Sequence, residues 1–176
     1  MLTTHEKAMM QDVERRLVEM RAHLSRELPA VEDTAAWYAF LADLKSIQGN
    51  SSNDVSFVAT LLAKQYLARC FGVSNFDAAE KAQGAPGIDI DIRLPDGRRL
   101  VAEIKTTSPY MPNDLGAQQK ATFEKDFIKL RNAVAELKLF LVTEPRTFEL
   151  MKRLKYRLML QGVTVVLLTT NEEFTA

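Results

Sequence analysis

Cysteine is almost absent from this chain, and so are histidine and long apolar runs. Cys70 is the only cysteine among 176 residues, which excludes an intramolecular disulfide. It ends an apolar helical pattern, so we predict that it lies in the core and is not a nucleophile. No apolar run approaches the roughly 18 residues that a membrane-spanning helix needs. The polar start of the chain does not resemble a signal peptide, and we expect a cytoplasmic protein.

Several kinds of functional site lack their residues here. The two histidines, His5 and His23, have no neighbouring pattern of metal ligands. The sequence contains no glycine-rich phosphate loop and no serine–histidine–aspartate arrangement. Equal numbers of basic and acidic residues, 23 of each, exclude a highly basic protein. Residues 61–176 nevertheless hold 17 basic and 14 acidic residues, which allows a modest basic face there.

What the sequence does contain is a predicted β-hairpin over residues 84–107. Ile88, Ile90 and Ile92 alternate with charged residues, and the second strand alternates in a similar way. This period of two is typical of strands with one buried face. The segment Leu94-Pro95-Asp96-Gly97-Arg98 between them has the composition of a tight turn, because proline, aspartate and glycine suit its successive backbone conformations.

The turn also predicts which residues face each other. If Leu94 pairs with Arg98 across a three-residue loop, Asp89 lies opposite Glu103 on the neighbouring strand. Paired side chains are about 5 Å apart at Cβ, close enough for two carboxylates to share a metal ion. A two-residue loop would place these two acids on opposite faces. The turn residues favour the first register.

A Glu-x-Lys triplet carries little information by itself. About one chain of this length in two should contain it by chance. This chain has two copies, Glu103-Ile104-Lys105 and Glu136-Leu137-Lys138. The second copy ends a helical pattern, with no upstream strand, turn or facing acid. The first copy follows a tight turn and faces Asp89, so we predict that a functional site lies there.

These residues resemble the PD-(D/E)xK nuclease superfamily, which has the restriction-endonuclease-like fold. The resemblance rests on Pro86-Gly87-Ile88-Asp89, on Glu103-Ile104-Lys105 and on the order of the elements that follow. It implies that Asp89 and Glu103 bind Mg²⁺, or Mn²⁺ in its place, together with the carbonyl of Ile104. It also implies that Lys105 orients or activates the attacking water.

The same residue types suit phosphodiester hydrolysis on chemical grounds. Mg²⁺ prefers oxygen ligands and is usually held by one or two carboxylates and a substrate phosphate. Such an ion lowers the pKa of a bound water, and an adjacent ammonium stabilises developing charge. Asp91 is the rival for the first acid, but Asp89 follows Pro86-Gly87 after a single residue and is expected to pair with Glu103. The alternative is a surface hairpin that carries scattered charges.

The order of predicted elements indicates an α/β fold. We expect a restriction-endonuclease-like mixed central β-sheet flanked by helices, with an N-terminal helical extension. The first expected helix covers residues 4–28, and a second begins near Asp33. A third is capped at Asn53 or Asp54 and ends near Cys70.

The polar segment 49–53 predicts a boundary between a helical region, residues 1–50, and a nuclease-like domain, residues 51–176. After the hairpin we expect a helix from Asp114 to about Leu137, a strand at 139–142, a helix from Pro145, and a last strand at 163–168.

We therefore predict a Mg²⁺-dependent nuclease that cleaves DNA internally, with RNA as the alternative substrate. The competing prediction is a non-catalytic α/β partner-binding module, or a nuclease subunit that acts only in a complex. Gln118, Gln119 and Lys120 begin the helix after Lys105 and are the candidate substrate contacts.

The first predicted helix carries an apolar stripe with a spacing of three and four residues. Its members are Met10, Val13, Leu17, Met20 and Leu24. Such a stripe packs either on the chain's own second helix or on a second copy of the chain. A homodimer through residues 4–28 would supply two active sites for cutting two strands.

Overall fold

The computed structural model describes residues 1–81 and 85–176 and divides into two compact units, Met1–Asp54 and Val55–Ala176. The first unit contains helix α1 (Thr4–Leu24) and helix α2 (Thr34–Gln48), which pack against each other. Helix α3 (Ser51–Phe71) begins in this unit and continues into the second. The predicted start of the second helix near Asp33 is confirmed, because α2 begins at Thr34 and the Asp33 carboxylate accepts a hydrogen bond from the Ala36 N–H.

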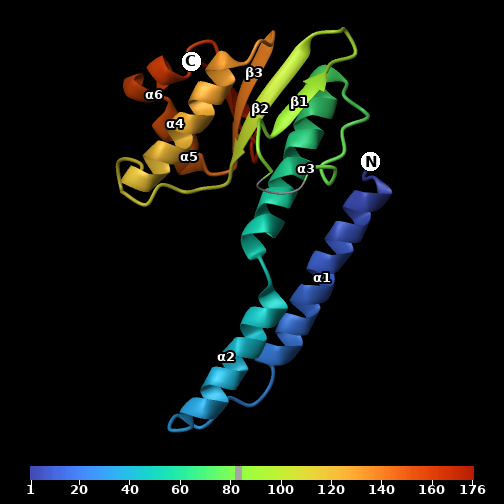
Figure 1. Ribbon diagram of the computed structural model, residues 1–176, viewed down its shortest axis with the longest axis vertical. Helices are drawn as coiled ribbons and strands as arrows, with labels where there is room; N and C mark the ends of the chain where they lie inside the picture. Colours follow the sequence, from blue (N-terminus) through green and yellow to red (C-terminus); the bar gives the residue numbers. More distant parts are fainter. Residues whose placement is uncertain (82–84) are drawn as a thin grey trace. The chain divides into compact units, whose positions relative to one another are not determined.

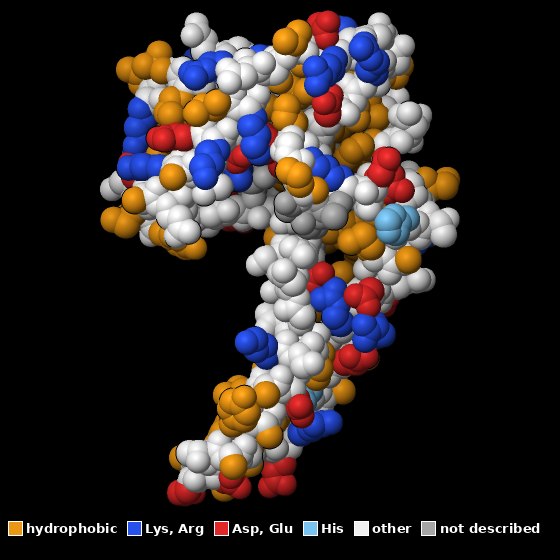
Figure 2. All heavy atoms as spheres, viewed as in Figure 1, with side chains coloured by type: hydrophobic (Ala, Val, Ile, Leu, Met, Phe, Trp, Pro, Cys, Tyr) orange, Lys and Arg blue, Asp and Glu red, His pale blue; other side chains and the backbone are white. Residues whose placement is uncertain are grey.

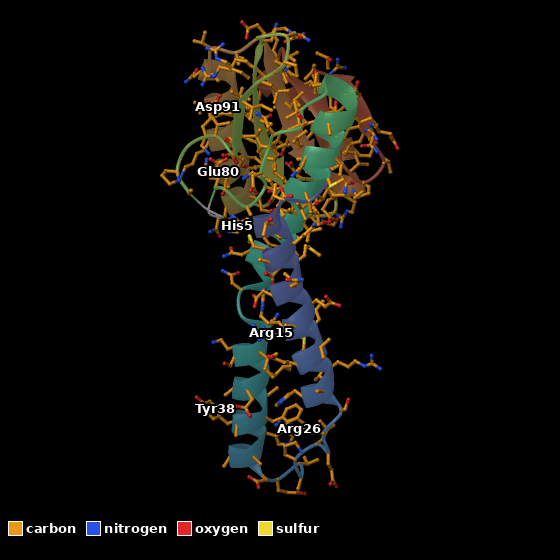
Figure 3. All side chains as sticks on the ribbon, turned by 90° about the vertical axis from the view of Figure 1, so that its right-hand side faces the viewer. His5, Arg15, Arg26, Tyr38, Glu80 and Asp91 are labelled. Atoms are coloured by element: carbon orange, nitrogen blue, oxygen red, sulfur yellow. The ribbon has the colours of Figure 1, made fainter. Side chains whose placement is uncertain are left out.

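The helical unit buries very little apolar surface. Its only fully buried side chains are Glu6, in the capping box of α1, and His23, whose Nε2 lies 2.9 Å from the Phe40 carbonyl. Leu17 on α1 is 59% exposed, and Tyr38 projects outward from α2 with 77% of its surface exposed (Figure 3). Two helices of this kind have no apolar core of their own.

The second unit is built on a five-stranded mixed sheet in the order β1-β2-β3-β4-β5 (Figure 1). The strands are β1 (Ile90–Arg93), β2 (Arg99–Lys105), β3 (Leu137–Val142), β4 (Thr164–Leu167) and β5 (Glu172–Thr175). Strands β2, β3 and β4 are parallel, and the two edge strands pair antiparallel with their neighbours. Between them lie α4 (Ala117–Asn132), α5 (Pro145–Met151) and α6 (Leu154–Met159). The expected α/β class, with N-terminal helices and a mixed sheet, is confirmed.

The predicted hairpin register is confirmed. The Leu94 N–H donates to the Arg98 carbonyl at 2.8 Å, and the Gly97 N–H donates to the Leu94 carbonyl at 2.9 Å. Gly97 has a φ of 89°, a conformation that glycine adopts without steric cost. The turn therefore closes a three-residue loop, and Ile90 pairs with Ala102 as that register requires.

Successive residues of β2 enter two different cores, one on each face of the sheet. Val101 packs in the core under α4, α5 and α6, with Phe123, Phe127 and Leu130 from α4. Leu100 and Ala102 pack in the core under α3. The same alternation turns Glu103 toward α4, on the face of the sheet that Val101 also occupies. An acid therefore lies at a position where an apolar residue would be expected.

Several expectations for local structure were wrong. Strand β1 begins at Ile90, and Ile88 packs against the core opposite to that of Ile90, so the three isoleucines do not share a face. Cys70 is exposed, because the buried stripe of α3 ends before it, at Tyr66 and Leu67.

Element boundaries differ as well. Helix α3 starts before the predicted caps, and α4 is shorter than the predicted 114–137 segment. The helix from Pro145 is two helices, since the chain breaks helical geometry between Met151 and Leu154. The polar strand β5 was not predicted. No helix of the described residues is both long enough and apolar enough to cross a membrane.

Candidate active site

Asp89 lies just before β1 and reaches across to β2. Its Oδ2 accepts a hydrogen bond from the Ile104 N–H at 2.9 Å, which fixes the carboxylate beside the Glu103-Ile104-Lys105 triplet. The preceding Gly87 has a φ of 98°, so this tight bend suits glycine. In a longer strand pair the Ile104 N–H would donate to a backbone carbonyl. Here it donates to the Asp89 side chain at the edge of the sheet.

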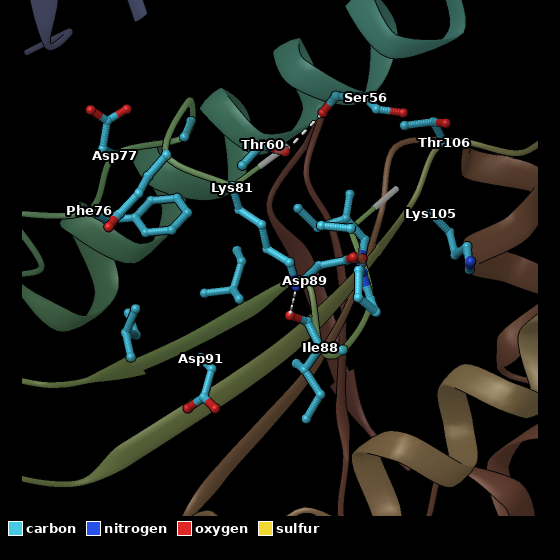
Figure 4. Close-up of a pocket in the computed structure, with 18 residues that line it drawn as sticks. Ser56, Thr60, Phe76, Asp77, Lys81, Ile88, Asp89, Asp91, Lys105 and Thr106 are labelled. Carbon is cyan, nitrogen blue, oxygen red and sulfur yellow. Dashed lines mark hydrogen bonds between the residues drawn. The ribbon is translucent and has the colours of Figure 1, made fainter. Parts of the chain in front are cut away.

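Two lysines hold the loop that precedes Asp89. Lys81 donates to the Ile88 carbonyl at 2.5 Å, as Figure 4 shows, and Lys129 of α4 donates to the Gly87 carbonyl at 3.2 Å. The loop is therefore fixed by cations from two different segments, and the position of Asp89 depends on both.

Glu103 is 1% exposed, and its carboxyl has an unusual protonation equilibrium. Burial, the negative charges of Asp89 and Asp126 and a hydrogen bond with the Asp89 carboxyl together raise its pKa from 4.5 to about 8. The ammonium of Lys129, 3.2 Å from Glu103 Oε1, opposes these effects. Near neutral pH this group is therefore poised between its charged and neutral forms.

Lys105 is directed to the same side of the sheet. Its Nζ lies 2.5 Å from Asp126 Oδ2, and the lysine and aspartate side chains are 17% and 6% exposed. The ammonium also lies 5.7 Å from the centre of the Phe123 ring. These contacts hold Lys105 against α4, next to Glu103.

Asp126 and Lys129 were not predicted as site residues. Both come from α4, and Asp126 lies within the buried stripe formed by Phe123, Phe127 and Leu130. An acid three residues after Phe123 on the apolar face of a helix is the signal that could have identified it. The structure therefore assembles Asp89, Glu103, Lys105, Asp126 and Lys129 from three segments of the chain.

Asp91, the rival first acid, has a different environment. Its two carboxylate oxygens accept hydrogen bonds from Arg99 at 2.8 and 2.7 Å, and these bonds lower its pKa. The side chain is 45% exposed, and Figure 4 shows it apart from Asp89. This geometry favours Asp89 over Asp91 as the acid beside Glu103.

The three predicted substrate contacts have three different environments. Gln119 is buried, and its amide accepts hydrogen bonds from the Tyr110 and Gly116 N–H groups and donates to the Ser108 carbonyl. These bonds use the amide within the loop, so Gln119 has a structural role there, and a substrate contact through this side chain stays a prediction. Lys120 pairs with Asp114 at 2.8 Å, and Gln118 is exposed at the surface.

A cleft of about 630 Å³ opens beside the site. Asp89 and Lys105 line it on one side, and Thr60 and Phe76 line it on the other (Figure 4). The cleft is large enough for a nucleotide-sized group, since ligand pockets commonly measure about 300–1,000 Å³. It gives access to Asp89 from the edge of the sheet.

The donor set fits a hard divalent cation that keeps part of its water shell. Among the described residues no group of three or more histidine, cysteine, aspartate or glutamate side chains has a metal-binding arrangement. Asp89 and Glu103 supply two carboxylates, which is the usual number for Mg²⁺. Glu103 Oε1 is fully buried and lacks a hydrogen bond of good geometry, and the cation beside it is the Lys129 ammonium at 3.2 Å.

Charge is mixed over the face of the second unit shown in Figure 2. Lysine and arginine side chains are interspersed with acidic ones and form no continuous basic surface there.

Comparison of the chain with protein-family models, with curated proteins and with solved structures gives no match. The proposals below depend on the geometry of the site and on the resemblance of its motif.

Proposed function

We propose that this protein is a cytoplasmic, Mg²⁺-dependent phosphodiester hydrolase, a DNA endonuclease of the PD-(D/E)xK type. The observation that carries the proposal is the buried Glu103 beside Asp89 and Lys105 at the end of β2. Like charges held this close require a counter-ion, a proton or both. A divalent cation supplies that compensation, with Mn²⁺ able to replace Mg²⁺.

Each residue has a proposed role in hydrolysis. Asp89 and Glu103, with the Ile104 carbonyl, would hold the ion, which supplies an acidified water and neutralises charge on the phosphate. Glu103 would release its proton to solvent on binding the ion, because its raised pKa keeps the free carboxyl protonated near neutral pH. Lys105 donates a hydrogen bond to the attacking water, and its contact with Asp126 fixes the direction of that donor.

DNA is the proposed substrate, and RNA is the alternative. The test is incubation of the full chain with circular single-stranded DNA, circular double-stranded DNA and RNA in Mg²⁺, Mn²⁺ or EDTA. Circular substrates have no ends, so cleavage of circular DNA in Mg²⁺ or Mn²⁺ but not in EDTA is expected for an endonuclease. Cleavage of RNA alone would change the substrate class. An absence of cleavage in every condition would contradict the proposal.

A second candidate function is favoured by the surface of the helical unit. Leu17, Leu24 and Leu41 are each more than half exposed, and such side chains are common in surfaces that bind proteins. The competing proposal is thus a partner-binding module, or a nuclease subunit that acts only in a complex. Full metal-dependent activity of the isolated chain would exclude both forms.

Assembly is part of the proposal, because one active site cuts one strand. We propose a homodimer through residues 4–28, where Met10, Val13 and Met20 are half-buried and Leu17 and Leu24 are exposed. Light scattering of the full chain should give twice the monomer mass. Replacing both Leu17 and Leu24 with glutamate should give a monomer, because negative charges from the two copies would then meet in an apolar contact. A monomeric wild-type chain at tens of micromolar would contradict this assembly.

A further inference from the structure

Lys129 has three oxygen atoms around its ammonium, and each comes from a different segment. Its Nζ lies 2.9 Å from Asp126 Oδ1, 3.2 Å from Glu103 Oε1 and 3.2 Å from the Gly87 carbonyl. These are two carboxylates and one backbone carbonyl, the oxygen types that hard cations take as ligands. The ammonium therefore occupies a position at which a metal ion would find suitable donors.

The lysine and its partners differ sharply in exposure. The side chains of Glu103 and Asp126 are 2% and 6% exposed, whereas the side chain of Lys129 is 40% exposed. Lysine reaches such a site through a flexible stem with water beside it, so it can move out without unfolding the helix. The two acids have no comparable freedom, because they lie within the core between α4 and the sheet.

A second cation remains when Lys129 leaves. Asp126 contacts Lys129 through Oδ1 and Lys105 through Oδ2, and Lys105 is the more buried of the two lysines. Displacement of Lys129 would thus leave Asp126 neutralised by Lys105. Glu103 Oε1 would be left without its nearby ammonium, and this oxygen already lacks a hydrogen bond of good geometry.

We propose that Lys129 is a displaceable internal counter-ion. A divalent cation bound by Glu103 would displace the Lys129 ammonium, which would then no longer donate to the Gly87 carbonyl. This inference rests on the proposed metal-dependent function and deepens it. It assigns Lys129 as a competitor of the metal and assigns Asp126, through Oδ1, as an acceptor for a water on that metal. The resting protein is stabilised by its own ammonium, and the ion must compete with that group.

Removing the lysine charge should strengthen metal binding. The substitution Lys129→Met takes away a competitor and a like charge at the site, so the Mn²⁺ dissociation constant should fall at least about tenfold. The Mn²⁺-dependent rise in melting temperature should be larger in the variant than in the wild type, because binding stabilises the folded state by mass action. Lys125→Met is the matched control, since Lys125 is an exposed lysine on the same helix.

The experiment is titration of the full chain with Mn²⁺ by calorimetry, together with thermal unfolding with and without Mn²⁺. Tighter binding in Lys129→Met, with Lys125→Met equal to the wild type, is the expected result. Lys129→Gln is the second variant, because its amide still donates to the carbonyl while its charge is lost. Equal or weaker affinity in the folded variants would overturn the inference and leave the proposed function intact. An absence of Mn²⁺ binding in every protein, including the wild type, would overturn both.

Discussion

The two Glu-x-Lys triplets of this chain lie on adjacent parallel strands but near opposite ends of the sheet. Glu103-Ile104-Lys105 ends β2, whereas Glu136-Leu137-Lys138 begins β3, and Leu137 pairs with Leu100 near the start of β2. The same three-letter pattern therefore meets two different environments within one sheet, and each triplet serves as a control for the other.

The glutamates of the two triplets differ in burial and in the direction of their pKa shifts. Glu136 is exposed and accepts a hydrogen bond from the Arg99 N–H at 2.8 Å, which lowers its pKa. Lys138 donates to the Arg131 carbonyl. Glu103 is buried beside two other acids, and its pKa is raised to about 8. Burial and neighbouring charge, rather than the triplet, thus distinguish a candidate active site from a strand end.

The largest expected difference between the triplets is in cleavage. Glu103→Gln should lower the metal-dependent rate at least about 100-fold, because it removes a charged ligand in a buried site. Glu136→Gln should stay within about twofold of the wild type, since surface substitutions of this kind have small effects. Rates of nicking of circular DNA in Mn²⁺ provide the measurement. Equal losses in the two variants would refute the assignment of the site.

A second prediction concerns Asp89, the acid next to Glu103. Asp89→Asn should also lower the cleavage rate about 100-fold, because the amide can still accept from the Ile104 N–H but carries no charge for the metal. Asp91→Asn should leave the rate within a few-fold, since it loses only an ion pair with Arg99 at the surface. Inactivity of Asp91→Asn with an active Asp89→Asn would reverse the choice of first acid.

A smaller effect is expected at Asp126, which contacts Lys105 and touches no substrate in the proposed mechanism. Asp126→Asn should reduce kcat about tenfold and change KM little, because Lys105 keeps its charge but loses its orienting partner. Lys138→Met is the matched control in the other triplet and should change neither constant. Steady-state rates at several DNA concentrations separate the two constants. A change confined to KM would contradict a positioning role for Asp126.

A further prediction concerns the stability of the metal-free protein. Glu103 has a raised pKa, so the folded state binds its proton more tightly than the unfolded state does. Its stabilising contribution is complete below its unfolded pKa of about 4.5 and is lost as pH rises toward 8, with a slope of at most about 1.4 kcal/mol per pH unit. Glu103→Gln should remove this decline.

Glu136 should show the opposite sign. Its lowered pKa means that its stabilising contribution is present above the unfolded pKa and is lost as pH falls through the folded value. Urea unfolding in EDTA between pH 4 and pH 8 compares both variants with the wild type. A decline toward pH 8 that persists in Glu103→Gln would show that another group causes it.

The sequence predicted the parts of the site that depend on local rules. The Pro95-Asp96-Gly97 turn allows few loop geometries, so the pairing of Ile90 with Ala102, which brings Asp89 near Glu103, followed from it. The apolar runs of β3 and β4 and the proline at the start of α5 were also sufficient to place those elements.

The residues that were missed depend on tertiary contacts. Asp126 and Lys129 reach the site only because α4 packs over β2, and no local pattern specifies which turn of that helix lies over Glu103. The structural role of Gln119 depends on the path of the loop at residues 108–116. The strand β5 is polar, and its pairing with β4 rather than its sequence identifies it.

Binding of Mn²⁺ to the wild type, Glu103→Gln and Glu136→Gln tests the central claim most directly. Calorimetric titrations near pH 7 in two buffers of different ionisation enthalpy give both the affinity and the number of protons released. We predict one site in the wild type and in Glu136→Gln, with release of a substantial fraction of one proton from Glu103, and loss of binding in Glu103→Gln. Binding of equal strength in Glu103→Gln, or its absence in the wild type, would contradict the account.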